Sequence, residues 1–308
     1  MKQEAHPNSP KKLMNGRRRS LALLGSLPFA GLYPTLSAKD SSFSKSLKHD
    51  KKLAYDLSDP MDQLLIFEKL RGDISGKQTY SYSEGRVFGI RPDQPEDLGA
   101  FGKEVFRYSA CGMRIKRVNE ANHVETRSRS WLLYQDPATS AFIDKMKNPY
   151  TGAEVVVPAF RGGISGSTMT PNGPKVSANF SMESTAFNSP INLVFTDMGD
   201  RMHVTRHAFT RWLEKKTQTH RTEMTLDTYD FDKEALYDRS LTHIPSDSHW
   251  TSQTAWLSLL DMREVPGHML WTSSGFCFFD KADLPEKFVT ATQEKQPDIF
   301  NEPLSWED

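Results

Sequence analysis

The pattern of hydrophobic and polar residues changes its period at about residue 78. Before that point, Met61, Leu64 and Leu65 fall on one side of a segment with a helical period. Asp59 is a good N-cap, and the proline after it suits the first helical position, where no amide hydrogen is needed. Gly72 provides a stop. The sequence therefore predicts a helix from about residue 59 to 71, packed as a lid or plug against a sheet.

From residue 78 onward the side chains alternate with a period of two, which is typical of β-strands. One face of the segment 78–90 is bulky and the other is small. The bulky face consists of Gln78, Tyr80, Tyr82, Glu84, Arg86, Phe88 and Ile90, and the small face of Thr79, Ser81, Ser83, Gly85, Val87 and Gly89. We expect the bulky face to point into the interior of a barrel.

The rest of the chain continues the strand pattern, interrupted by turn residues. Further strands are expected at about 105–118, 124–134, 141–146, 154–157, 175–183, 191–196, 202–212 and 268–279. The glycine-rich stretch 161–167 and the polar stretch 215–249 are expected to be a loop over the barrel mouth and a lid. Residues 255–260 are expected to be helical, and a terminal helix starts near 283. The predicted fold class is mainly β: a large antiparallel, barrel-like sheet of the calycin or lipocalin type with an N-terminal and a C-terminal helix.

The N-terminus has the features of a twin-arginine export signal. Arg17, Arg18 and Arg19 precede an apolar segment at 21–36 that glycine and proline interrupt, so it is too short to span a membrane. A disordered basic tail is the alternative. We expect a signal peptide at 1–38, a flexible linker at 39–57 and a single domain at 58–308. The protein would then use the twin-arginine machinery to reach the periplasm or the medium, without stable membrane insertion.

Charge and cysteine content restrict the possible partners. The chain has 39 basic and 39 acidic residues, and the leader carries an excess of basic ones, so the remainder is acidic. An acidic surface argues against nucleic acid as a partner. Cys111 and Cys277 allow at most one disulfide, and both a bridge and two free thiols remain open.

The segment 202–212 carries the strongest candidate chemistry. One face presents His203, His207 and Arg211 together with Phe209. If this face lines a cavity, the two histidines would act as general acid and base, and Arg211 would hold an anionic oxygen. The alternative is that this face lies in solvent. The residues that would then pack in the core are Met202, Val204, Ala208 and Trp212.

The predicted ligand-binding residues, which include part of the facing wall, are Tyr80, Tyr82, Glu84, Arg86 and Phe209. Glu84 and Arg86 lie two apart on one face, so a structural ion pair is their alternative role. Histidines four apart on a strand are about 13 Å apart, too far to share a metal ion. No nucleotide-binding loop or nucleophile elbow occurs in the sequence. We therefore expect neither a metal nor a cofactor.

Several short motifs resemble one known family. They are Leu70-Arg71-Gly72, Tyr82-x-x-Gly85-x-Val87-Phe88, Trp131-Leu132-Leu133-Tyr134-x-Asp136-Pro137-x-Thr139, Asn148-Pro149-x-Thr151-Gly152-x-Glu154-Val155, Pro266-Gly267-His268-Met269-Leu270-Trp271 and Asp283-Leu284-Pro285. In this order they resemble the bacterial and fungal family catalogued as domain of unknown function 1838, from about residue 59 to 288. The resemblance implies that a twin-arginine leader is common, and it implies no catalytic residues.

Two functions remain open from the sequence. One is a cofactor-independent enzyme that acts on a small, partly hydrophobic molecule by acid–base chemistry in a barrel cavity. The other is a lipocalin-like carrier that holds a lipophilic molecule without changing it. A histidine that faces the cavity with a sharply shifted pKa would favour the enzyme, and an all-apolar cavity with every histidine outside it would favour the carrier.

Overall fold

The computed structural model describes residues 52–94, 102–176, 187–214 and 219–306. These residues belong to one compact unit, Asp50–Asp308. The predicted signal peptide at 1–38 and most of the predicted linker lie outside the described residues. The fold is mainly β, as predicted, with one helix before the strands and one after them.

The elements have the following bounds. The α-helices are α1 (Pro60–Leu70) and α3 (Glu286–Lys295), and the short 3-10 helices are η1 (Lys233–Tyr237), η2 (Ser258–Leu260) and η3 (Lys281–Asp283). The strands are β1 (Thr79–Ile90), β2 (Lys103–Val118), β3 (Val124–Gln135), β4 (Lys145–Lys147), β5 (Glu154–Val156), β6 (Phe160–Arg161), β7 (Ser165–Thr170), β8 (Gly173–Val176), β9 (Phe187–Asn188), β10 (Leu193–Met198), β11 (Arg201–Glu214), β12 (Thr219–Asp232), β13 (Ser246–Thr254) and β14 (His268–Phe278).

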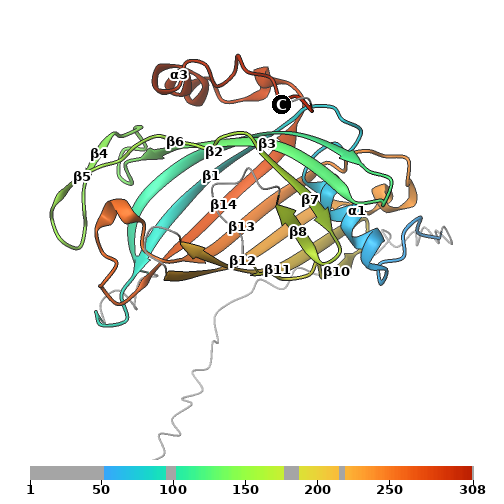
Figure 1. Cartoon of the computed structure of the whole chain (residues 1–308), viewed down its shortest axis with the longest axis horizontal. Helices are drawn as coiled ribbons and strands as arrows, with labels where there is room; N and C mark the ends of the chain where they lie inside the picture. The colour runs from blue at the N-terminus through green and yellow to red at the C-terminus, as the bar shows by residue number, and fades with distance from the viewer. Residues whose placement is uncertain (1–51, 95–101, 177–186, 215–218, 307–308) are drawn as a thin grey trace, which may run out of the picture. The chain divides into compact units, whose positions relative to one another are not determined.

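Twelve of the strands form one antiparallel sheet in the order β10-β11-β12-β13-β14-β1-β2-β3-β7-β8, with β9 added beside β11 and β6 beside β3. Strands β4 and β5 form a separate hairpin. The sheet curls around a concave face, and β14 near the C-terminus pairs with β1 near the start (Figure 1). Among the described strands no ladder joins β10 to β8, so the pairing confirms the antiparallel sheet but not a closed barrel.

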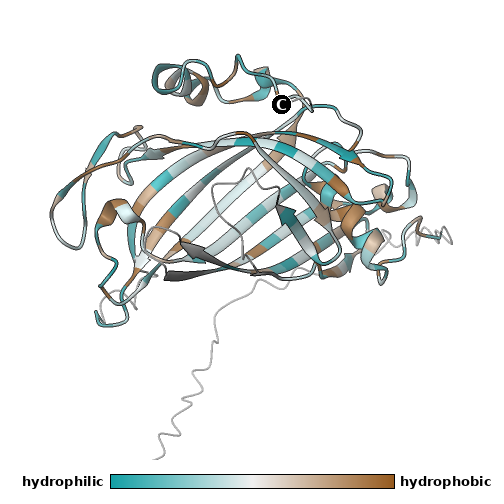
Figure 2. Ribbon diagram, viewed as in Figure 1, coloured by the Kyte–Doolittle hydropathy of each residue, from teal (hydrophilic) through white to brown (hydrophobic). Residues whose placement is uncertain are grey.

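Helix α1 packs on the concave face at one end of the sheet. The Asp59 carboxylate accepts a hydrogen bond from the Met61 amide at 3.0 Å, which caps the helix as predicted. Its buried side chains, among them Phe67, form a hydrophobic cluster with Val204 of β11 and Phe231 of β12. Figure 2 shows these hydrophobic residues of α1 against strands of mixed polarity. The predicted plug is therefore a helix that fills one end of the concave side.

The last residues of the predicted linker are part of this packing. Tyr55 is buried in the α1 cluster, and its hydroxyl accepts a hydrogen bond from Lys69 Nζ at 2.7 Å. The Asp56 amide donates to the Asp62 carboxylate at 2.7 Å. Residues 52–57 therefore form an ordered strap along α1, so the prediction of a flexible linker is wrong for these residues.

Helix α3 covers the opposite, outer face of the sheet. Phe288 of α3 stacks on Trp131 of β3 with ring centroids 6.2 Å apart, and it meets Tyr82 of β1 edge-on at 5.2 Å. Tyr80 packs against the same cluster. The expectation that the bulky face of β1 points inward is therefore wrong. The C-terminal helix supplies the apolar cover that these tyrosines need, and the small face of β1 is the one that turns inward.

Several predicted loops are strands instead. The glycine-rich stretch 161–167 joins the sheet through β6 and β7, which both pair with β3. In the polar stretch 215–249, residues 219–232 form β12 and residues 246–249 begin β13, so a large part of the expected lid belongs to the sheet. Residues 215–218 lie outside the described residues. Conversely, only residues 145 and 146 of the strand expected at 141–146 belong to a ladder, as part of β4. The helix expected at 255–260 is reduced to η2.

The two cysteines are free. Cys111 packs in the outer cluster beneath α3, whereas Cys277 lines the concave side. A bridge between thiols on opposite faces of a sheet is excluded by disulfide geometry. In the described part of the chain no helix combines the length and the apolar composition needed to span a membrane.

Candidate functional site

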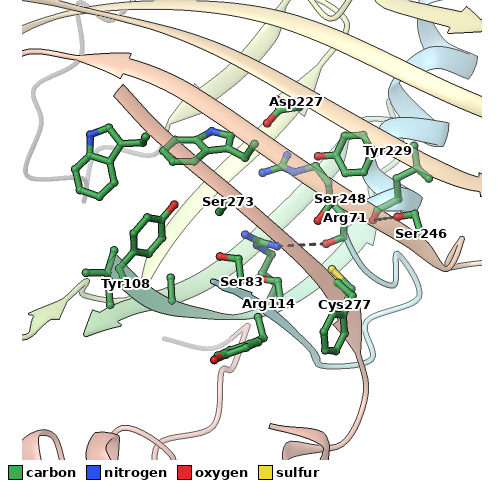
Figure 3. A pocket seen from close by; sticks show the side chains of 18 residues that line it. Arg71, Ser83, Tyr108, Arg114, Asp227, Tyr229, Ser246, Ser248, Ser273 and Cys277 are labelled. Carbon is green, nitrogen blue, oxygen red and sulfur yellow. Dashed lines mark hydrogen bonds between the residues drawn. The ribbon is translucent and has the colours of Figure 1, made fainter. Parts of the chain in front are cut away.

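A cavity of about 370 Å³ lies on the concave face (Figure 3). Its walls come from the end of α1 and from β1, β2, β3, β12, β13 and β14. It lies between the α1 cluster and a second hydrophobic cluster that contains Val87, Trp256 and Met269. The volume falls in the range of pockets that hold small organic molecules.

Short inward side chains explain why this part of the concave face is hollow. The wall is built from Ser81 and Ser83 of β1, Ala110 of β2, Ser248 of β13 and Ser273 of β14. Neighbouring strands therefore present only small residues toward the same space. Larger residues on the alternate positions point to the outer face, so no side chain fills the interior at these positions.

One end of the cavity is aromatic. Tyr108 of β2 meets Trp271 of β14 at a centroid distance of 5.4 Å, and Trp271 meets Trp250 of β13 at 6.5 Å. The Tyr108 ring also lies against Gly85, where an added Cβ would come within 2.5 Å of it. Burial raises the pKa of Tyr108 to about 12, so its hydroxyl is neutral at physiological pH. This end offers flat apolar surfaces with few charges.

The other end is cationic. Arg71, which follows α1, and Arg114 of β2 both line the cavity (Figure 3). Arg71 Nη1 donates to Glu68 Oε1 at 3.0 Å, and Arg114 Nη1 donates to the Arg71 carbonyl at 3.5 Å. Within the described residues, Arg114 has no carboxylate at ion-pair distance. Burial and the nearby Arg71 lower the pKa of Arg114, although a guanidinium remains charged at any physiological pH.

Glu68 and Lys116 form a buried ion pair beneath these arginines. Lys116 Nζ lies 2.8 Å from Glu68 Oε2, and each side chain is 1% exposed. Burial by itself would raise the pKa of Glu68, but Lys116 and Arg71 lower it to about 2. Burial lowers the pKa of Lys116 to about 8; Glu68 opposes this shift, whereas Arg71 adds to it. The base of the cavity is therefore a fixed cluster of charges.

A second ion pair lies on the β11–β12 side. Arg206 Nη1 lies 2.7 Å from Asp227 Oδ2, and both side chains are largely buried. The Arg206 Nε atom is buried and has no hydrogen-bond partner among the residues that the structure describes. Next to it, Tyr229 lines the cavity, and burial raises the pKa of its hydroxyl well above the ordinary range.

The predicted catalytic residues lie elsewhere. His207, Phe209 and Arg211 are exposed on the outer face of β11. His203 is half-buried there, with Nδ1 2.8 Å from Asp230 Oδ1 and Nε2 3.1 Å from Thr205 Oγ1. The alternative from the sequence, a solvent-facing histidine face with the other residues in the core, describes this strand: Met202, Val204 and Ala208 are buried. The side chain of Trp212 lies outside the described residues. The catalytic role of the histidines stays a prediction.

The other predicted ligand-binding residues also lie on the outer face. Tyr82 contributes to the cavity wall, but its hydroxyl bonds Glu84 Oε1 at 2.6 Å and Ser109 Oγ at 3.2 Å on the α3 side. Arg86 pairs with Glu104, with Nε 2.9 Å from Oε1. The expected ion pair between Glu84 and Arg86 is therefore wrong. Tyr80 packs beneath α3. Tyr82 and Glu84 line an outer groove together with Asp230, the partner of His203, but His203 itself does not line that groove. The ligand-binding role of this group stays a prediction.

The residues that sequence reasoning missed are Arg71, Arg114, Asp227 and Tyr229. A signal for Arg114 existed: it shares one strand face with Tyr108, Ala110 and Gly112, and a charge on a face of small and aromatic residues points to a lined cavity. Asp227 and Tyr229 carried no such signal, because polar residues occur on both faces of their segment and no hydrophobic period marks it as a strand.

Comparison with known proteins adds a family but no activity. Among the described residues there is no group of His, Cys, Asp and Glu side chains placed to hold a metal ion. No curated protein matches the chain. A family model described as "Protein of unknown function (DUF1838)" matches residues 76–308. Because the match spans most of the chain, the protein belongs to this family, as the motifs had indicated.

Proposed function

We propose that the protein is a lipocalin-like binding protein that holds a small, partly hydrophobic molecule in the concave cavity. The observation that carries this proposal is the cavity itself: small side chains leave the space, and Tyr108, Trp250 and Trp271 line one end of it. Aromatic surfaces around a preformed space are typical of ligand sites. A sheet that curls around such a space is the arrangement that small-molecule carriers use.

An acid–base enzyme has less support. No histidine of the described chain lines the cavity. Burial lowers the pKa of His243, but this side chain lies beside the end of α1, where its Nδ1 is 3.1 Å from the Lys69 carbonyl. The cavity instead contains arginines, tyrosines and serine hydroxyls, which bind and orient better than they exchange protons at neutral pH.

A pair of adjacent serines provides the test of where a ligand binds. Ser273 lines the concave cavity, whereas Ser274 lines a groove of about 690 Å³ on the outer face. We expect Ser273→Phe to weaken binding of the neutral fluorescent probe N-phenylnaphthylamine about tenfold or more, because the new ring occupies the space. Ser274→Phe is the matched control and should change the affinity about twofold at most.

Fluorescence titration of the purified protein measures both affinities, and near-UV circular dichroism checks that both variants keep the native packing. Loss of binding in Ser274→Phe alone would place the ligand in the outer groove. Equal binding by both variants and the parent would show that the probe uses neither site. Either result contradicts the proposal.

We further propose that the protein is exported by the twin-arginine route to the periplasm or the medium. The support is the cluster Arg17, Arg18 and Arg19 before a short interrupted apolar segment. Changing all three arginines to lysine keeps the charge but removes the arginine pair that the machinery reads. The exported fraction, measured by cell fractionation and immunoblotting, should then fall to near zero. Unchanged export would contradict the proposal.

A further inference from the structure

We infer that the ligand of the cavity is an organic anion, with its acidic group between Arg71 and Arg114 and its hydrophobic part against Tyr108, Trp250 and Trp271. This inference rests on the proposed function, because it names the chemical class of the molecule that the same cavity would bind. It goes beyond that function by assigning the charge of the ligand and its orientation.

The first argument is the balance of charge. Among the described residues, the ionised side chains in the cavity wall and directly beneath it are Arg71, Arg114, Lys116, Arg206, Glu68 and Asp227. Both carboxylates already have partners: Glu68 pairs with Lys116 and Arg71, and Asp227 pairs with Arg206. The cations therefore exceed the carboxylates by two. Uncompensated buried charge is costly, and an anionic ligand would supply the missing partner.

The second argument is the position of the Arg114 guanidinium. Its Nη2 atom lies 3.5 Å from the point where a Cβ of Gly112 would be, so the side chain folds back over its own strand toward the hollow part of the wall. A larger residue at 112 would occupy this path. Within the described part of the chain, its one hydrogen bond, to the Arg71 carbonyl, is long at 3.5 Å. Most of its donors are therefore available to a planar acidic group.

The third argument is the separation of charge and aromatic surface. Tyr108 and Arg114 lie on the same face of β2, six residues apart, which corresponds to about 20 Å between their Cα atoms. The guanidinium is closer to Tyr108 than this, because the Arg114 side chain folds back toward Gly112. Only Ala110 and Gly112 lie between them on that face. A ligand that contacts both ends has its acid at one end and its apolar part at the other. The volume of about 370 Å³ limits that apolar part to a small ring system.

A pair of probes that differ only in charge tests the inference on the full-length protein. Naphthoate carries a carboxylate, and naphthalenemethanol is a neutral molecule of nearly the same shape. We expect isothermal titration calorimetry to show naphthoate binding about tenfold or more tightly, as charge-assisted hydrogen bonds to a guanidinium allow. In Arg114→Gln this preference should fall to about twofold, through weaker binding of naphthoate alone.

Naphthalenemethanol serves as the internal control for folding, because its affinity for Arg114→Gln should be unchanged. Arg117→Gln is the matched charge control: Arg117 lies on the same strand, but its side chain is 53% exposed and pairs with Glu125. It should keep the full preference for naphthoate. Equal affinity of both probes for the parent protein would overturn the inference and leave the proposed function standing. Binding of neither probe would overturn both.

Discussion

Glu68→Gln is expected to lower the free energy of unfolding by about 3–5 kcal/mol, the usual cost of breaking a buried ion pair from one side. Glu68 is 1% exposed and compensates Lys116 and Arg71, both within 3.0 Å of its carboxylate. A neutral glutamine leaves these cations, with Arg114 nearby, without a carboxylate in the cluster. Urea unfolding followed by tryptophan fluorescence measures the change.

Two further variants separate the charge effect from packing. Glu125→Gln removes the surface partner of Arg117; the Arg117 side chain is 53% exposed and the Glu125 side chain 28%. This change should lower the free energy of unfolding by less than about 1 kcal/mol. Glu68→Gln combined with Lys116→Met removes both charges of the pair and should recover much of the lost stability, because no uncompensated ammonium remains. A double variant as unstable as the single one would show that shape, not charge, makes Glu68 important.

The same carboxylate gives the second large effect, a loss of stability in acid. Lys116 and Arg71 lower the pKa of Glu68 from an ordinary value of 4.5 to about 2, against the effect of burial. Between these values the unfolded chain takes up the proton more readily than the folded protein. The contribution of Glu68 is therefore complete above pH 4.5 and is lost as the pH falls toward 2. At about 1.4 kcal/mol per unit, the loss amounts to roughly 3 kcal/mol.

Other acidic residues also titrate in this range, so the comparison must be made against a variant that lacks Glu68. The difference in unfolding free energy between the parent and Glu68→Gln should shrink as the pH is lowered from 5 toward 2.5. A constant difference across this window would show that the Glu68 carboxylate is not the group responsible. Urea titrations at each pH provide the measurement.

Elements with strong local signals could be predicted from the sequence. The helix α1 has its cap at Asp59 and its proline at the first position, and the structure shows both. Strands β1, β2, β3 and β14 have long alternating patterns between clear turns, and they form adjacent ladders in the sheet. Period and turn chemistry are local properties, so they are visible before any tertiary contact is known.

The polar strand β12 shows where this reasoning stops. Its inward residues include Asp227 and Tyr229, and its outward residues include Thr228 and Asp230, so both faces are polar. An alternation of polar with polar carries no hydrophobic period. Strand β12 is nevertheless central, because Arg206 on β11 compensates Asp227 and the backbone pairs on both sides.

The sequence also does not show which face of β1 points to the concave side. The side chains of β1 alternate between a bulky face and a small face, and the size of the residues favours the bulky face as the inward one. The structure places Tyr82 under Phe288 of α3 and turns Ser81 and Ser83 to the concave side. Helix α3 lies more than 190 residues further along the chain, so nothing local to β1 indicates that its outer face is covered.

The sequence by itself therefore determined the class of fold, the helix before the strands, the helix after them, and the family. Local propensity and short motifs are sufficient for these. The tertiary structure alone decided which side of each strand faces the hollow, and that choice brings Arg71 and Arg114 to the same space. Their partnership depends on α1 and β2 meeting on the concave face, a contact between segments 43 residues apart that no periodicity encodes.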